Sequence, residues 1–168
     1  MINALAKLRS IVDKILSYAC GMIFAIMVII GTYQIVVRYF FNSPSTVSEE
    51  LLTYSFTWMA LLASAYVFGK RDHMRMGFIA DKITGNPKKV LEVLIELLII
   101  AMVAGIMIFG GFSIMDLTMT QKTASLGVPM GVIYTIIPIS GILIFVYGIM
   151  NIVDIINDVK HEQREVKE

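Results

Sequence analysis

The side chains that most often do chemistry are few in this sequence and lie apart from one another. Its two histidines are His73 and His161, and neither has a Cys or His partner at the spacing of a metal site. Cys20 is the single cysteine, so an internal disulfide is impossible and we expect it to be a small packing residue. No Ser or Cys nucleophile has a nearby base. We therefore predict that the chain is not an enzyme and holds no metal or cofactor.

The charged residues avoid the most hydrophobic parts of the sequence. All 27 Asp, Glu, Lys and Arg residues lie outside four long uncharged runs. A charge in the middle of a membrane costs only about 3 kcal/mol on the insertion scale, and carriers accept that cost where function needs it. Because the four runs contain no charged residue, they offer no acidic ion site and no proton relay.

One acidic pair stands directly before the second run. Thr46-Val47-Ser48-Glu49 has the form of a capping box, in which Thr46 would cap a helix and Glu49 would reach back to it. Glu49 and Glu50 would also lie at the positive end of the helix dipole. In an alternative interpretation, one carboxylate meets a partner or pairs with Arg38 at the end of the first run. Both can hold, because adjacent helical residues point about 100° apart.

The second run carries two different helical stripes. The residues that follow Glu49 on one stripe are small or hydroxylated, and those that follow Glu50 on the other are bulkier. Small and hydroxyl side chains let helices approach closely in lipid, so we expect their stripe to face inward. Trp58, on the bulky stripe, would then contact lipid, pack internally or be buried against another subunit; we favour an outward orientation. The small stripe is Thr53, Thr57, Ala60 and Ser64, and the bulky one is Glu50, Tyr54, Trp58, Leu61 and Ala65.

The elements that must position these residues are membrane-spanning helices. Of the residues, 57% are hydrophobic and 16% are charged, and the mean hydropathy is +0.78, whereas soluble domains carry about 25% charged residues. A hydrocarbon core about 30 Å thick needs roughly 20 apolar residues as helix. Apolar residues on every side of the runs exclude the strict alternation of a barrel strand. The uncharged runs are 15–37, 51–69, 97–115 and 126–153.

We therefore predict an all-α integral membrane protein with four transmembrane helices, forming a single membrane domain over residues 1–168. Gly127, Pro129 and Gly131 predict an entry loop before the fourth helix, and the helix that contains the third run should begin in the cytoplasm near Lys88. Pro138 should kink the fourth helix, where Gly141 and Gly148 favour close packing. A short interfacial helix is expected at 73–84, between spans two and three. The predicted spans are about 15–37, 51–69, 93–115 and 132–153.

The basic residues predict the orientation. Twelve of the fourteen Lys and Arg residues fall in the N-terminal flank, the segment between spans two and three, or the C-terminal tail. The other two are Arg38 and Lys122. By the positive-inside rule, both termini and the middle loop are predicted to be cytoplasmic.

Residues 38–78, RYFFNSPSTVSEELLTYSFTWMALLASAYVFGKRDHMRMGF, resemble the small membrane subunit of tripartite ATP-independent periplasmic (TRAP) transporters. The similarity lies in an Arg after span one, an Asn-Ser-Pro turn, a Glu-Glu pair, a Trp eight residues later and a basic-His-x-Arg step after span two. No single feature is specific to the family, but together they are fairly specific.

The resemblance implies a bacterial inner-membrane protein that works with a large membrane subunit and a periplasmic substrate-binding protein. The large subunit would carry the substrate, an organic acid such as a C4-dicarboxylate or a sialic acid, and would bind the coupling sodium ions. The small subunit would brace it, with membrane lipids and no nucleic acid among its contacts. The alternatives are a small four-helix scaffold or an exporter outside any tripartite system. The candidate partner-interface residues are Arg38, Glu49, Glu50, Trp58, His73 and Arg75.

Overall fold

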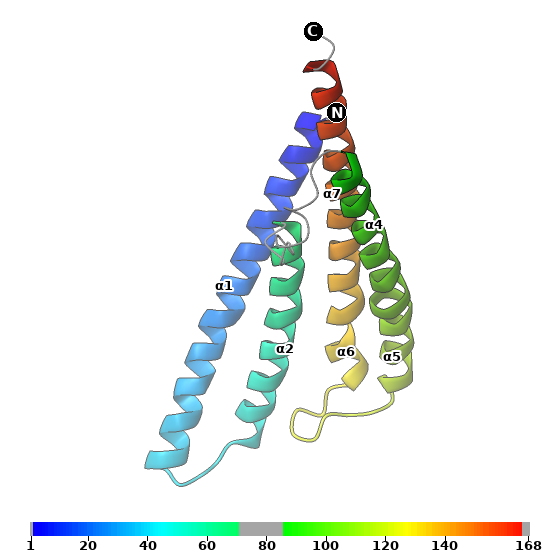
Figure 1. The fold of residues 1–168 in the computed structure, drawn as a ribbon. Helices are drawn as coiled ribbons and strands as arrows, with labels where there is room; N and C mark the ends of the chain where they lie inside the picture. The colour runs from blue at the N-terminus through cyan, green and yellow to red at the C-terminus, as the bar shows by residue number, and fades with distance from the viewer. Residues whose placement is uncertain (1, 71–85, 166–168) are drawn as a thin grey trace.

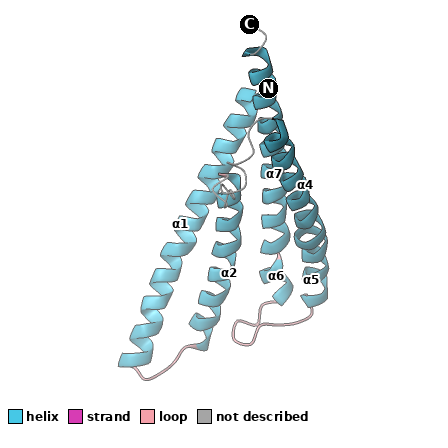
Figure 2. Cartoon of the chain, viewed as in Figure 1, coloured by secondary structure: helices cyan, strands magenta, loops and turns pink. Residues whose placement is uncertain are grey.

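The computed structural model describes residues 2–70 and 86–165, and within them the chain is helical, joined by loops (Figures 1 and 2). The predicted all-α fold is confirmed. Four helical stretches of the described residues are long and apolar enough to cross a membrane: Lys7–Phe40, Thr46–Gly69, Val90–Thr118 and Met130–Ile156. The elements are α1 (Ile2–Phe40), α2 (Thr46–Gly69), α4 (Asn86–Met102), η1 (Val103–Phe109), α5 (Gly110–Thr118), α6 (Met130–Tyr134) and α7 (Ile136–Glu165).

The first and last helices are longer than the uncharged runs inside them. Helix α1 has 39 residues, which corresponds to about 58 Å at 1.5 Å per residue. Helix α7 has 30 residues and continues to Glu165. An uncharged run therefore marks the part of a helix that fits the membrane, while the helix itself continues through the charged residues beyond it. The start of α1 and the end of α7 lie at the same end of the bundle (Figure 1).

Helix α7 lies at the centre of the packing. It packs against α2, η1 and α4, whereas α1 packs mainly against α2. The core is formed by buried side chains from all four helical stretches. Its members include Leu16, Leu62, Ala65, Phe68, Val103, Ile136, Ile144, Tyr147 and Met150.

Glycines bring these helices together, as predicted for Gly141 and Gly148. A Cβ atom added to Gly141 would lie 2.8 Å from Met107 Cβ, and one added to Gly148 would lie 2.7 Å from Ile100 Cγ1. Neither distance leaves room for a methyl group. In lipid, such close approach supplies much of the association between helices.

The third span contains a π-helical segment that the sequence did not predict. Chain helicity runs from Asn86 to Thr118, but η1 interrupts the α-helix at Val103–Phe109, and Gly110 N–H closes it by donating to the Gly105 carbonyl. The run is apolar on every side, so it has no hydrophobic periodicity from which a change from α-helix to π-helix could be predicted. The segment packs against α7.

The fourth span is broken where its proline predicted a kink. Helix α6 ends at Tyr134 and α7 begins at Ile136, with Thr135 between them. Pro138 has no N–H to donate to the Tyr134 carbonyl four residues earlier, which weakens the helix at this turn.

The predicted interfacial helix at 73–84 lies outside the described residues.

Candidate functional site

Glu50 joins the start of α2 to the loop between α5 and α6. Its carboxylate accepts hydrogen bonds from the backbone N–H groups of Ala124, Ser125 and Leu126 at 3.1, 2.8 and 2.9 Å. Tyr54, one turn along α2, donates its hydroxyl to the same carboxylate at 2.8 Å. Hydrogen bonds to an ionised acceptor are about twice as strong as neutral ones. This carboxylate therefore ties the second span to the entry of the fourth.

The loop that Glu50 binds is itself compact. Thr123 N–H donates to the Val128 carbonyl at 2.9 Å, and Val128 N–H returns a bond to the Thr123 hydroxyl at 3.1 Å. Met130 N–H donates to the Gln121 carbonyl at 2.8 Å. Gly127 has a positive φ of 66°, a conformation that favours glycine. The loop thus presents three N–H groups in one direction, toward α2.

The predicted capping box at Thr46 and Glu49 is wrong. Ser45 is the N-cap of α2, and its side chain accepts a hydrogen bond from Ser48 N–H at 3.4 Å. Ser48 in turn donates its hydroxyl to the Ser45 carbonyl at 3.1 Å. Ser48 is buried, so its hydroxyl needs a local acceptor. Glu49 lies exposed on the first turn.

Arg38 lies exposed in the last turn of α1. Among the described residues it forms no ion pair with Glu49 or Glu50, so the alternative in which one of these carboxylates pairs with Arg38 is wrong within this chain. Glu50 makes its bonds to the loop instead. Arg38 and Glu49 remain exposed candidates for contact with a partner, and His73 and Arg75 lie outside the described residues.

The two stripes of α2 face opposite to the directions predicted. Trp58 packs against the core and donates its indole N–H to the Ile133 carbonyl at 3.0 Å. That carbonyl lies next to the break between α6 and α7, and the indole N–H needs an acceptor because lipid offers none. The bulky stripe therefore faces the bundle.

The small stripe is turned outward. Thr53, Thr57 and Ser64 are exposed, and each hydroxyl donates to the carbonyl four residues earlier in α2, at 3.0, 3.0 and 2.8 Å. These local bonds let a hydroxyl lie on an apolar surface without another partner. The three hydroxyl protons on this outward stripe are therefore already used within α2.

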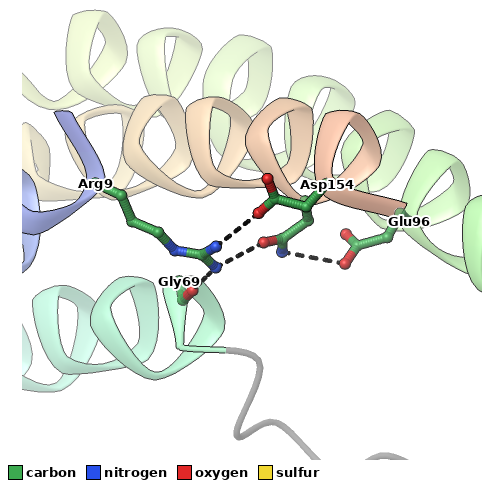
Figure 3. Close-up of polar contacts among 5 residues, drawn as sticks. Arg9, Gly69, Glu96 and Asp154 are labelled. Carbon is green, nitrogen blue, oxygen red and sulfur yellow. Dashed lines mark hydrogen bonds and ion pairs between the residues drawn. The ribbon is translucent and has the colours of Figure 1, made fainter. Parts of the chain in front are cut away.

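A second polar cluster, at the opposite end of the bundle, joins helices that are distant in sequence (Figure 3). Arg9 of α1 donates to the Asp154 carboxylate at 2.9 Å and to the Asn151 side-chain carbonyl at 2.8 Å, both on α7. Its guanidinium also donates to the carbonyl of Gly69, at the end of α2. Asn151 donates to the Glu96 carboxylate of α4 at 3.1 Å. We call these five residues the Arg9 network.

A neighbouring bond extends this connection. Tyr147 of α7 is 1% exposed and donates its hydroxyl to Asp13 of α1 at 2.5 Å. Its ring occupies the space above Gly69, where an added Cβ would lie 2.5 Å from the ring carbon Cε1. Gly69 thus makes room for the aromatic ring and supplies a carbonyl to Arg9.

Sequence reasoning missed the Arg9 network because it used the basic residues only to count charges. A signal was present: Arg9, Asp13, Glu96 and Asp154 all stand at the predicted cytoplasmic ends of spans. Opposite charges at the same membrane boundary indicate possible pairing, but only the tertiary structure selects the pairs.

The fold and these contacts define a small four-helix integral membrane protein in which Glu50 and the Arg9 network join the protein's own helices. The family model for tripartite ATP-independent periplasmic transporters, DctQ component, matches residues 27–158. That match covers more than half of the chain, and the chain belongs to this family. It is a multi-pass protein of the bacterial inner membrane and a small permease subunit of a TRAP transporter.

Individual relatives agree with the family. A TRAP transporter small permease protein of Haemophilus influenzae is 26% identical over 138 residues, which cover 82% of this chain and 85% of the relative. Another from the same organism is 29% identical over 140 residues, 83% and 84% of the two chains. The sialic acid TRAP transporter small permease protein SiaQ of Vibrio cholerae is 27% identical over 106 residues, 63% of this chain and 61% of that relative.

Proposed function

We propose that this subunit braces the large membrane subunit of its transporter during sodium-coupled uptake of an organic acid. The family to which it belongs is tripartite, which implies a large membrane subunit and a periplasmic binding protein as partners. The substrate would be of the C4-dicarboxylate or sialic acid class, and the printed name of the Vibrio relative supports the latter.

The observation that carries the bracing role is the use of polar groups within the bundle. Glu50 binds three backbone N–H groups of its own chain, and Arg9 binds Asp154 and Asn151. Both sets stabilise the arrangement of the helices at the two ends of the spans. The four apolar runs, which lie between these two ends of the bundle, contain no Asp or Glu side chain that could bind an ion. Sodium would therefore bind to the large subunit, and this chain would hold no cofactor.

Reconstitution into liposomes tests the proposal. The purified chain alone should take up no labelled organic acid under a sodium gradient, whereas the chain with its large subunit and binding protein should. Omitting only this chain should abolish uptake by the remaining two. Sodium-driven uptake by the chain alone would contradict the proposal, as would full activity of the other two components without it.

The alternatives are a four-helix scaffold or an exporter outside a tripartite system. A self-sufficient exporter of this size normally needs a carboxylate within the membrane. Glu50 and Glu96, which directly precede the second and third uncharged runs, accept hydrogen bonds from the loop and from Asn151 within this chain. Membership of the family favours the tripartite role over both.

A further inference from the structure

An open groove of about 480 Å³ lies between α1 and the end of α2, beside the Arg9 network. Charged and hydroxyl side chains contribute to its lining, unlike the apolar surface of the remaining spans. Three cationic side chains and one carboxylate line it. Among the lining residues are Ser10, Asp13, Lys14 and Ser17 of α1, with Tyr66 and Lys70 at the end of α2.

Three of the four charged lining groups, Arg9, Asp13 and Lys70, contact other residues of the chain. Arg9 donates to Asp154 and Asn151, and Asp13 accepts the Tyr147 hydroxyl. Lys14 and Lys70 are exposed, and the Lys70 ammonium lies 4.5 Å from the centre of the Tyr66 ring. The groove therefore combines a net positive charge with the hydroxyl groups of Ser10 and Ser17. Such a set of donors suits a phosphodiester anion.

The groove lies at the height of lipid headgroups. Lys14 directly precedes the uncharged run 15–37, which spans about 35 Å as helix. The hydrocarbon core is about 30 Å thick. When this run fills the core, Lys14 lies at the level of the phosphates on one surface.

The same face of α1 continues into the membrane as an apolar surface. Gly21, Phe24 and Val28 follow Ser17 at spacings of four, three and four residues, which keeps them on one helical face. Phe24 and Val28 are 57% and 52% exposed. A Cβ atom added to Gly21 would meet nothing within 4 Å. The surface below the groove is therefore open to an acyl chain.

We propose that this groove binds the headgroup phosphate of an anionic phospholipid, with an acyl chain lying along Gly21, Phe24 and Val28. The lysines would attract the negative headgroup, and the membrane would supply the ligand laterally. The donors that line the groove could bind the phosphate of any ester, so the experiments must distinguish a lipid headgroup from a soluble anion.

Native mass spectrometry of the full-length protein in detergent, with equimolar phosphatidylglycerol and phosphatidylcholine, measures which lipid is retained. The wild type should retain phosphatidylglycerol preferentially. The double variant Lys14→Gln/Lys70→Gln should lower that retention at least fivefold, and Lys14→Arg/Lys70→Arg should keep it. Lys122→Gln, which removes one positive charge in the loop at the other end, is the matched control and should behave as wild type. Equal retention by the wild type and the Gln double variant would overturn the proposal.

Thermal unfolding distinguishes the source of the phosphate. Phosphatidylglycerol in mixed micelles should raise the Tm of the wild type by several degrees and should not raise that of the Gln double variant. Inorganic phosphate at millimolar concentration should produce no comparable rise. Equal stabilisation by inorganic phosphate would overturn the lipid assignment. Gly21→Leu, which fills the apolar surface, should weaken phosphatidylglycerol retention, and unchanged retention would contradict the placement of the acyl chain.

Discussion

Trp58 packs inside the helix bundle, where its indole N–H has the acceptor that it needs. The indole donates to the Ile133 carbonyl at 3.0 Å and its ring packs against the core. A variant at this position should therefore act first on the stability of the small subunit itself. Any effect on the large subunit would follow from that loss.

Trp58→Phe keeps most of the apolar ring and removes the N–H donor. Because a buried carbonyl then loses a partner, we expect the free energy of unfolding to fall by about 1 kcal/mol. The measurement is thermal unfolding by circular dichroism, since Trp58 is the single tryptophan and its fluorescence is lost with it. Thr57→Ala, on the exposed stripe, is the control and should change stability little. A larger loss in Thr57→Ala than in Trp58→Phe would reverse the assignment of the two stripes.

Glu50→Gln tests the bond between α2 and the loop. The carboxylate accepts four hydrogen bonds, three of them from Ala124, Ser125 and Leu126. An amide offers only one oxygen as acceptor, so the loop should open more often. Hydrogen bonds to an ionised acceptor are stronger than those to a neutral one, so their loss should be measurable. Hydrogen exchange should speed up at residues 124–126.

The control for this variant is Glu49→Gln, which changes the neighbouring exposed carboxylate. It should leave exchange in the loop unchanged. If Glu49→Gln accelerated exchange at 124–126 as much as Glu50→Gln, the assignment of the bond to Glu50 would fail.

At the scale of the elements, α7 is held by close contact through its glycines. Gly141 faces Met107 in η1, and an added Cβ would lie 2.8 Å from Met107 Cβ. Met107 Cβ is fixed to the backbone, so it cannot turn aside as the end of a flexible side chain could. The π-helical segment and the glycine therefore meet as two backbone surfaces.

Gly141→Ala should consequently separate α7 from η1. Overpacking of this kind costs about 1–3 kcal/mol, even though alanine favours the helix itself by about 1 kcal/mol. Gly21→Ala is the matched control, because its Cβ would meet nothing within 4 Å. The Tm should fall for Gly141→Ala and rise for Gly21→Ala. A rise in Tm for Gly141→Ala would show that the helices can adjust without cost.

At the scale of the whole molecule, the Arg9 network joins the same end of all four helical stretches. Arg9 and Asp154 have side chains that are 23% and 40% exposed. Partial exposure reduces the contribution of the ion pair itself. The bonds to Asn151 and to the Gly69 carbonyl add to it.

Arg9→Gln should lower the free energy of unfolding by about 2 kcal/mol, the scale of a lost charged hydrogen bond. Asp154→Asn should lower it by less, because it leaves the other two bonds of Arg9 in place. In a double-mutant cycle the losses should not add, since both changes break one shared contact. Additive losses would show that the contact between Arg9 and Asp154 does not contribute to the free energy of unfolding.

The orientation in the membrane is a further prediction at this scale. Twelve of the fourteen basic residues lie in the segments predicted to be cytoplasmic. In a Cys20→Ser background, an impermeant thiol reagent should label Ser43→Cys or Gln121→Cys in intact cells, and Glu168→Cys only after lysis. Ser43 and Gln121 are exposed in the structure, so access should depend on the side of the membrane. Labelling of Ser43→Cys only after lysis would overturn the orientation.

Much of this protein could be predicted from its sequence because lipid imposes simple rules. Backbone groups in hydrocarbon must be satisfied within their own segment, so four apolar runs already predict four helices. The break near Pro138 and the close contacts at Gly141 and Gly148 depend on local backbone chemistry. These features require no knowledge of which helices are neighbours.

The tertiary structure decided which surfaces face inward and which polar groups pair. Both stripes of α2 are compatible with lipid or protein by composition, and the direction of Trp58 is determined by the Ile133 carbonyl, 75 residues away. From the sequence alone, Glu50 is expected at the positive end of the helix dipole, but its carboxylate binds three N–H groups of a distant loop. The Arg9 network likewise draws on four helical stretches. Such choices depend on long-range packing, because a polar side chain at the edge of a membrane takes the partner that the other helices bring within reach.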